Sequence, residues 1–183
     1  MIPWIKTDRS WITINIPECG CDHAIVFVHN NLHPDHYEWL KKYDDLILVC
    51  GIPETVEKVE HIGKAIYLPL SIDVENVRQY AREKSKKTAF VGRRSKQKGI
   101  DLPKDIDYIE GLPRTKLLRA MAEYENVYAV GRTAIEAKAL GCNILPYNPR
   151  FPDPSRWRVM DNRESARILQ AKLNEIDGLS GEE

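Results

Sequence analysis

The chain has 183 residues, with 27 Lys and Arg against 27 Asp and Glu, so its formal net charge is zero. This balance provides no overall electrostatic attraction to nucleic acid or to an anionic membrane. A hydrophobic fraction of 43% and a charged fraction of 30% are typical of a globular protein and exclude a disordered or fibrous chain. The length suits one ordinary domain or two small lobes, which can fold without disulfides or metal.

The first residues, Met-Ile-Pro-Trp-Ile-Lys, lack the basic region and apolar core of a secretory signal. No apolar run approaches the roughly 18–20 residues that a membrane-spanning helix needs. Two of the four cysteines, Cys50 and Cys142, lie in or beside apolar runs and are interpreted as small buried hydrophobic residues. We therefore expect a cytoplasmic protein without a membrane span.

Short β-rich runs alternate with amphipathic segments of helix length. The expected strands are 12–16, 24–29, 46–50, 65–70, 88–91, 108–109, 127–130 and 144–147. The expected helices are 37–43, 53–61, 74–84, 113–123, 133–140 and 163–176. This alternation predicts an α/β fold of Rossmann-like, doubly wound parallel sheets. We place a hinge at 69–73, which divides the chain into a first lobe (1–72), a second lobe (73–160) and a C-terminal helix and tail (161–183).

One stretch departs from the overall charge balance. Residues 78–104 contain ten Lys and Arg against Glu83 and Asp101, a net charge of +8. The stretch is either a solvated helix face and linker or an anion site. Nucleic acid is the less favoured partner, because no recognised motif is present and no aromatic residues are interleaved for base stacking.

The segment 127–140 contains the first candidate site. A buried strand is expected to end at Gly131, and Thr133 with Glu136 forms a Thr-x-x-Glu pattern that is typical of a helix-capping box. The same segment suits a ligand, because helix N-termini at the carboxyl edge of a parallel sheet bind anions. Gly131 allows close backbone approach, Arg132 can bind phosphate, and Glu136 can accept hydrogen bonds from ribose or sugar hydroxyls. Both interpretations stay open.

A second candidate follows the strand 88–91. Gly92 is followed by Arg93 and Arg94, with Lys98 just beyond, and a glycine with two arginines at a strand end suits a diphosphate.

A third candidate is the histidine-rich run 29–36, in which His29 ends a strand and is the best candidate for a group facing a ligand. Pro34 places this run in a loop, so it lacks the rigid spacing of a metal site. The Cys19-x-Cys21 pair has no second pair to complete a ligand set. No metal and no cofactor is predicted.

Three segments together resemble GT-B glycosyltransferases. Residues 65–73 resemble the crossover between the two lobes of that family, and residues 88–99 resemble the strand that opens its nucleotide-sugar-binding lobe. Residues 126–145, which include Glu136, are similar to its Glu-Ala-x-Ala-x-Gly-x-Pro-Val-Ile segment. The resemblance covers roughly residues 24–147.

The resemblance implies a minimal GT-B arrangement with a truncated N-terminal lobe, and a nucleotide-activated sugar as ligand. Arg93 and Lys98 would hold the diphosphate, Thr133 would lie near the phosphates, Glu136 would bind the ribose, and His29 would face the acceptor.

Transfer would proceed without a metal, since no Asp-x-Asp motif is present. Tyr128 stands where the family has a second glutamate, which keeps open a non-catalytic descendant that binds a nucleotide or a partner protein. A lobe of this size could complete its core through a second copy, which favours a homodimer.

Overall fold

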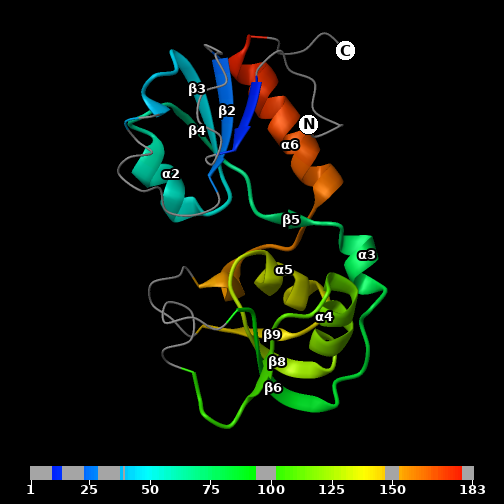
Figure 1. Ribbon diagram of the computed structural model, residues 1–183. Helices are drawn as coiled ribbons and strands as arrows, with labels where there is room; N and C mark the ends of the chain where they lie inside the picture. The colour runs from blue at the N-terminus through cyan, green and yellow to red at the C-terminus, as the bar shows by residue number, and fades with distance from the viewer. Residues whose placement is uncertain are drawn as a thin grey trace. The chain divides into compact units, whose positions relative to one another are not determined.

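The computed structural model describes residues 10–13, 23–28, 38, 40–93, 102–146 and 153–178 (Figure 1). The chain divides into two compact units. Unit 1 combines residues 1–69 with 163–183, and unit 2 comprises residues 70–162. Within the described ranges, no helix is both long and apolar enough to cross a membrane.

Unit 1 is built on a four-stranded parallel sheet. Its strands are β1 (Ser10–Thr13), β2 (His23–Val28), β3 (Asp45–Cys50) and β4 (Lys64–Tyr67), and they pair in the order of the sequence. The continuous apolar run of β2 pairs along its full length with that of β3. Both strands are therefore buried on two faces, as the sequence predicts for central parallel strands.

The two faces of this sheet are covered by different parts of the chain. Alternate residues of β2 and β3 pack against Leu40 and against α2 (Pro53–Val59) on one face. The other residues, Ile25, Ile47 and Val49 among them, pack against α6 (Asn162–Ile176). Figure 1 shows α6, in orange, beside the blue and cyan strands, with α2 across the sheet from it.

This division follows from the strand order. Parallel crossovers are right-handed in nearly all proteins, so strands added in one direction place every connection on the same face. The described parts of these connections, Leu40 and α2, lie on one face, and the opposite face packs against α6. Leu169 and Leu173 of α6 fill that face with the C-terminal part of the chain.

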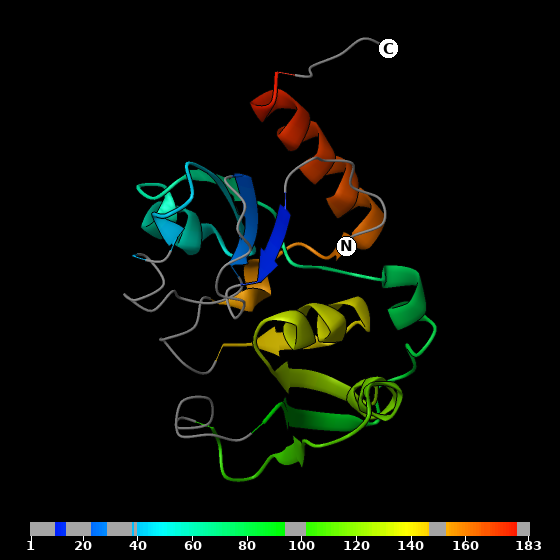
Figure 2. The ribbon, with the colours of Figure 1, turned by 45° about the horizontal axis from the view of Figure 1, so that its top comes forward.

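Unit 2 contains a second parallel sheet with a different order. Its strands are β6 (Lys86–Val91), β7 (Asp107–Ile109), β8 (Tyr124–Tyr128) and β9 (Asn143–Leu145), and they lie in the order β7-β6-β8-β9. The helices α3 (Val74–Arg78), α4 (Arg114–Met121) and α5 (Arg132–Ala139) share one hydrophobic core with this sheet. In Figure 2, α5, in yellow, lies along the sheet. Unit 2 is completed by the 3-10 turn η1 (Pro154–Arg156) and a short parallel pair of β5 (Ser71–Ile72) and β10 (Met160–Asp161).

The α/β class with parallel sheets is confirmed, and several details differ from expectation. The strands β1 and β8 begin two and three residues earlier than expected. The helix expected over 74–84 ends at Arg78. The two-residue strands β5 and β10 were not expected. The boundary between the units lies at Pro69, and the C-terminal helix belongs to unit 1 instead of forming a separate segment.

The basic stretch is paired with residues far away in the sequence. Arg82 and Lys86 contact the Glu123 carboxylate at 3.3 and 3.0 Å. Lys84 Nζ donates to the carbonyl oxygens of Ala122 and Leu140, which are the C-cap residues of α4 and α5. A cation is favourable at these helix ends because it complements their partial negative charge. This part of the stretch therefore has a structural role.

Candidate functional site

The strand order of unit 2 contains a topological switch point between β6 and β8. The chain leaves β6 toward β7 on one side and leaves β8 toward β9 on the other. Ligands of open parallel sheets collect at the carboxyl ends of the two strands that flank such a point. In unit 1 the described strands follow one another in sequence order, so they contain no switch point. The geometry therefore selects the carboxyl edge of β6 and β8.

The loop after β6 contains Gly92 and Arg93. Gly92 has a φ of 147°, which other residues rarely adopt, and its N–H donates to Ile109 O at 3.1 Å. Arg93 is exposed directly after it. Lys98, the second cation predicted here, lies outside the described residues, and so does His29.

The loop after β8 leads directly into α5 through Gly131. Its φ of 60° and ψ of −140° lie in a region that is essentially restricted to glycine. Because β6 and β8 are hydrogen-bonded neighbours, this glycine and Gly92 follow adjacent strands of one sheet edge. Two of the segments chosen from the sequence are thus brought to the same edge.

The predicted capping box is wrong. The helix α5 begins at Arg132, its N-cap is Gly131, and no side chain caps it. Thr133 is therefore the second residue of the helix instead of its cap. The glycine conformation starts the helix one residue earlier than the Thr-x-x-Glu pattern indicates, which leaves Glu136 without its predicted structural role.

Glu136 instead forms a buried ion-pair centre. Its side chain is 4% exposed, and its Oε1 lies 2.6 Å from Arg114 Nη1 and 3.3 Å from Arg132 Nε. Neither contact has hydrogen-bond geometry, so Oε1 is buried without a hydrogen-bond partner among the described residues. The carboxylate links the first turns of α4 and α5 through charge.

Both helices at this edge begin with an arginine. Arg114 and Arg132 are the first residues of α4 and α5, neither helix has an acidic residue in its first turn, and neither is capped by a side chain. The other described α-helices whose first turns are known, α2, α3 and α6, each carry a glutamate there. Positive charge at a helix N-terminus is unfavourable, because the backbone N–H groups already give that end partial positive charge. An anion bound at this edge would remove the conflict.

The charged groups of the edge are mostly basic. At the described carboxyl ends of β6, β7 and β8 (92–93, 110–113 and 129–131) and in the first five residues of α4 and α5, the charged residues are Arg93, Glu110, Arg114, Lys116, Arg132 and Glu136. Four cations against two carboxylates suit phosphate groups. No metal-binding cluster of His, Cys, Asp or Glu is present in the described part of the chain.

Arg114 and its contact with Glu136 were not predicted from the sequence. The two residues lie on different helices and 22 positions apart, and no local pattern connects them. The available signal was the Pro113-Arg114 start of a helix without an acidic first turn, which is unusual for a helix N-terminus.

The described cysteines are unsuited to nucleophilic chemistry. Burial raises the pKa of the Cys50 thiol to about 11, and burial also raises the pKa of Cys142 although Lys84 opposes that shift. Both are free and buried, so at neutral pH they remain protonated. The interpretation of both as buried hydrophobic residues is confirmed.

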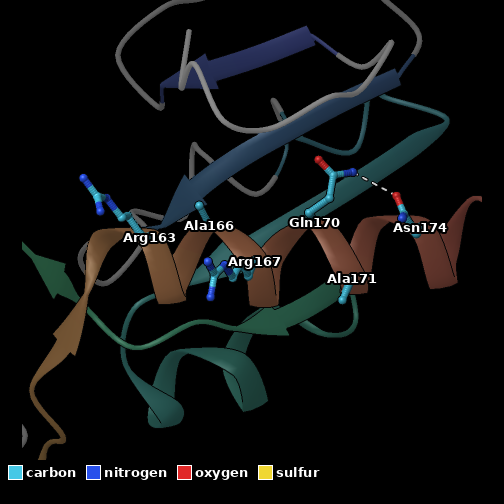
Figure 3. A pocket seen from close by; sticks show the side chains of 6 residues that line it. All are labelled: Arg163, Ala166, Arg167, Gln170, Ala171 and Asn174. Atoms are coloured by element: carbon cyan, nitrogen blue, oxygen red, sulfur yellow. Dashed lines mark hydrogen bonds between the residues drawn. The ribbon is translucent and has the colours of Figure 1, made fainter. Parts of the chain in front are cut away.

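A hollow lies along α6 in unit 1 (Figure 3). It has a volume of about 610 Å³. Its described lining is Arg163, Ala166, Arg167, Gln170, Ala171 and Asn174. Gln170 donates to the Asn174 amide oxygen at 2.8 Å. All of this lining comes from one helix, so the described residues do not converge on a ligand from several sides. The edge of unit 2 is the better candidate.

The comparisons with known proteins add no assignment to this geometry. A scan against protein-family models found no match, and a search of curated proteins found no significantly similar sequence. The site therefore has to be interpreted from its own residues.

Proposed function

We propose that the chain is a glycosyltransferase-like protein that binds a nucleotide-activated sugar at the carboxyl edge of the unit 2 sheet. The observation that carries the proposal is the pair of uncapped helices that begin with Arg114 and Arg132 beside a topological switch point. Acidic residues normally occupy such positions. Their replacement by arginines is explained if a ligand supplies the negative charge.

The diphosphate of the ligand would lie between the loops after β6 and β8. Arg93 and Arg132 would provide charge-assisted hydrogen bonds, and the first N–H groups of α5 would donate to phosphate oxygen. Gly92 and Gly131 let the backbone approach the ligand without a side chain in between. In this proposal Thr133 lies near the phosphates as part of the first turn of α5.

Glu136 would bind ribose only after a rearrangement. Its carboxylate is buried under two guanidinium groups, so a hydroxyl can reach it only if one of them moves toward phosphate. Lys98 as a second phosphate ligand and His29 as the group facing the acceptor complete the proposal from sequence resemblance.

Sugar transfer would break the bond between the anomeric carbon and the diphosphate oxygen and form a bond from that carbon to an acceptor oxygen. The acceptor proton passes to a base, for which His29 is the proposed group. Negative charge develops on the leaving diphosphate, and cations fixed before the reaction stabilise it without a metal. A GT-B arrangement of the two units and a homodimer belong to the same proposal.

A non-catalytic nucleotide-binding protein is the alternative. Tyr128 at the end of β8 favours it, because a tyrosine occupies the position where the resembled family has a glutamate that contacts the sugar. Binding would then persist without turnover.

Binding is tested by isothermal titration with UDP, GDP and ADP and with their sugar conjugates. We expect one nucleotide to bind, and we expect Arg93→Ala and Arg132→Ala each to weaken it about tenfold or more, since a hydrogen bond to a charged group contributes about 1.5–3 kcal/mol. Arg119→Ala removes a guanidinium at the opposite end of α4 and is the matched control. Unchanged affinity in both site variants would place any bound nucleotide elsewhere.

Transfer is tested separately by following release of the nucleoside diphosphate from each sugar conjugate. Turnover that decreases in His29→Ala while nucleotide affinity stays the same supports the transferase. Binding with no release from any conjugate leaves the non-catalytic alternative.

A further inference from the structure

Arg114 is held in place by a carboxylate on another helix. Its Nη1 lies 2.6 Å from Glu136 Oε1, and that oxygen also lies 3.3 Å from Arg132 Nε. Because both contacts end on one oxygen, the two nitrogens are within about 6 Å of each other. Two guanidinium groups from two helices thus converge on one buried carboxylate oxygen.

One carboxylate cannot neutralise two guanidinium groups, so a positive charge remains. Each guanidinium has five N–H donors, and the contact with Glu136 engages one nitrogen of each. The Arg114 and Arg132 side chains are 47% and 57% exposed. Their remaining donors are therefore accessible at the N-termini of α4 and α5.

The order of the residues indicates that helix stability does not explain this arrangement. Arg132 precedes Glu136 by four positions in α5, and a basic residue N-terminal to an acidic one is the weaker orientation of such a pair. Arg114 likewise adds positive charge to the positive end of α4.

We infer that Arg114 is a phosphate-binding residue positioned by Glu136, and that the site thereby selects ligands with two linked phosphates over ligands with one. This inference rests on the proposed nucleotide site and specifies its ligand class. Arg93 and Arg132 contact one phosphate from the loops after β6 and β8, and Arg114 supplies a guanidinium from α4 for the other. Glu136 limits the freedom of Arg114 before the ligand binds, so less conformational entropy is lost on binding.

A purely structural ion pair would behave differently. In that case Arg114 would serve only to compensate the buried charge of Glu136, and its loss would lower the melting temperature without changing the preference between ligands. The two roles are separated by the ratio of affinities for diphosphate and monophosphate ligands.

The experiment measures dissociation constants of the full chain for the di- and monophosphate of the nucleoside that binds best, and for pyrophosphate and phosphate. The variants are Arg114→Met, Arg114→Lys, Glu136→Gln and the control Lys116→Met. The control removes a cation from the same helical turn, whereas the ion pairs of Glu136 with described residues are made by Arg114 and Arg132. Circular dichroism melting curves establish that each variant folds.

We expect Arg114→Met to lower the affinity for diphosphate ligands about tenfold and the affinity for monophosphate ligands less than about threefold. Arg114→Lys should recover part of the lost diphosphate affinity. Lys116→Met should lower the affinities for both ligand classes equally and by less than about threefold. Glu136→Gln gives the sharpest result, because simple charge attraction predicts tighter anion binding whereas loss of the anchor predicts weaker diphosphate binding.

The inference is overturned if Arg114→Met changes the affinities for di- and monophosphate ligands in the same way as Lys116→Met. It is also overturned if Glu136→Gln tightens diphosphate binding. Pyrophosphate binding that depends on Arg114, with no nucleotide bound, would refute the proposed function and leave the inference standing. Nucleotide binding that depends on Arg93 and Arg132 but not on Arg114 would support the proposed function and refute the inference. Absence of binding by every probe would refute both.

Discussion

Arginine at the first position of a helix lowers helix stability by a few tenths of a kcal/mol up to about 1 kcal/mol. The chain accepts this cost twice at one sheet edge, at Arg114 and Arg132, while it places Lys84 against the C-termini of the same two helices, where a cation is favourable. The charges at the C-termini of α4 and α5 therefore complement the helix dipoles, whereas the charges at their N-termini oppose them. Such local conflicts are expected at functional sites.

Because of Cys50, the free energy of unfolding is expected to fall as the pH rises through the alkaline range. Burial raises the pKa of its thiol from 9.0 to about 11, so the unfolded state loses this proton first as pH rises. The stabilisation is fully present below about pH 9 and is lost as pH rises through about 11, with a total on the order of 2 kcal/mol. We expect the urea midpoint to fall between pH 8 and pH 10.5, and to fall less in Cys50→Ala. Equal slopes in both proteins would assign the effect to other groups.

Single residues of the site could be predicted where a local pattern was sufficient. Gly92, Arg93, Gly131 and Arg132 each follow an apolar strand, and the structure brings them to one edge. Thr133 was misassigned because the φ of Gly131, which sets the helix start, is not encoded in the Thr-x-x-Glu pattern. Arg114 was missed because its partner is set by the packing of two helices.

At the scale of elements, periodicity predicted the central strands well and the short ones poorly. The apolar runs of β2 and β3 favour strands because each is only six residues long and both contain β-branched residues. β5 and β10 have two residues each, too few for any period. The shortened α3 has another cause: beyond Arg78 the chain turns toward Glu123, whose backbone carbonyl accepts from Ser85 and Lys86.

The helix α6 covers one of the two faces of the unit 1 sheet. Leu169 and Leu173 are each 1% exposed and pack against Ile25, Ile47 and Val49. Leu169→Ala should lower the free energy of unfolding of unit 1 by about 2–5 kcal/mol, because it leaves a cavity in a packed core. Lys172→Ala, on the exposed side of the same helix, should change it by less than about 0.5 kcal/mol. Equal effects in urea unfolding curves would contradict the assigned packing.

At the scale of the whole molecule, unit 2 is formed by one continuous segment of the chain, whereas unit 1 combines two segments that are far apart in the sequence. The core of unit 2 is formed by residues between 70 and 162 alone, whereas unit 1 needs both ends of the chain. We expect a fragment of residues 70–162 to unfold cooperatively and to show the proposed nucleotide binding, and a fragment of residues 1–69 to lack a cooperative transition. Thermal melting and titration of the two fragments test this, and a cooperatively folded fragment 1–69 would contradict it.

The late position of α6 has a consequence for synthesis on the ribosome. About 95 residues separate Leu68, the last residue of the sheet face, from Arg163, where its cover begins. At a synthesis rate of roughly 5–20 residues per second, α6 is made about 5–20 s after the apolar face formed by Ile25, Ile47 and Val49. During that interval the nascent first unit exposes surface that chaperones recognise, and unit 2 can fold before the unit that precedes it.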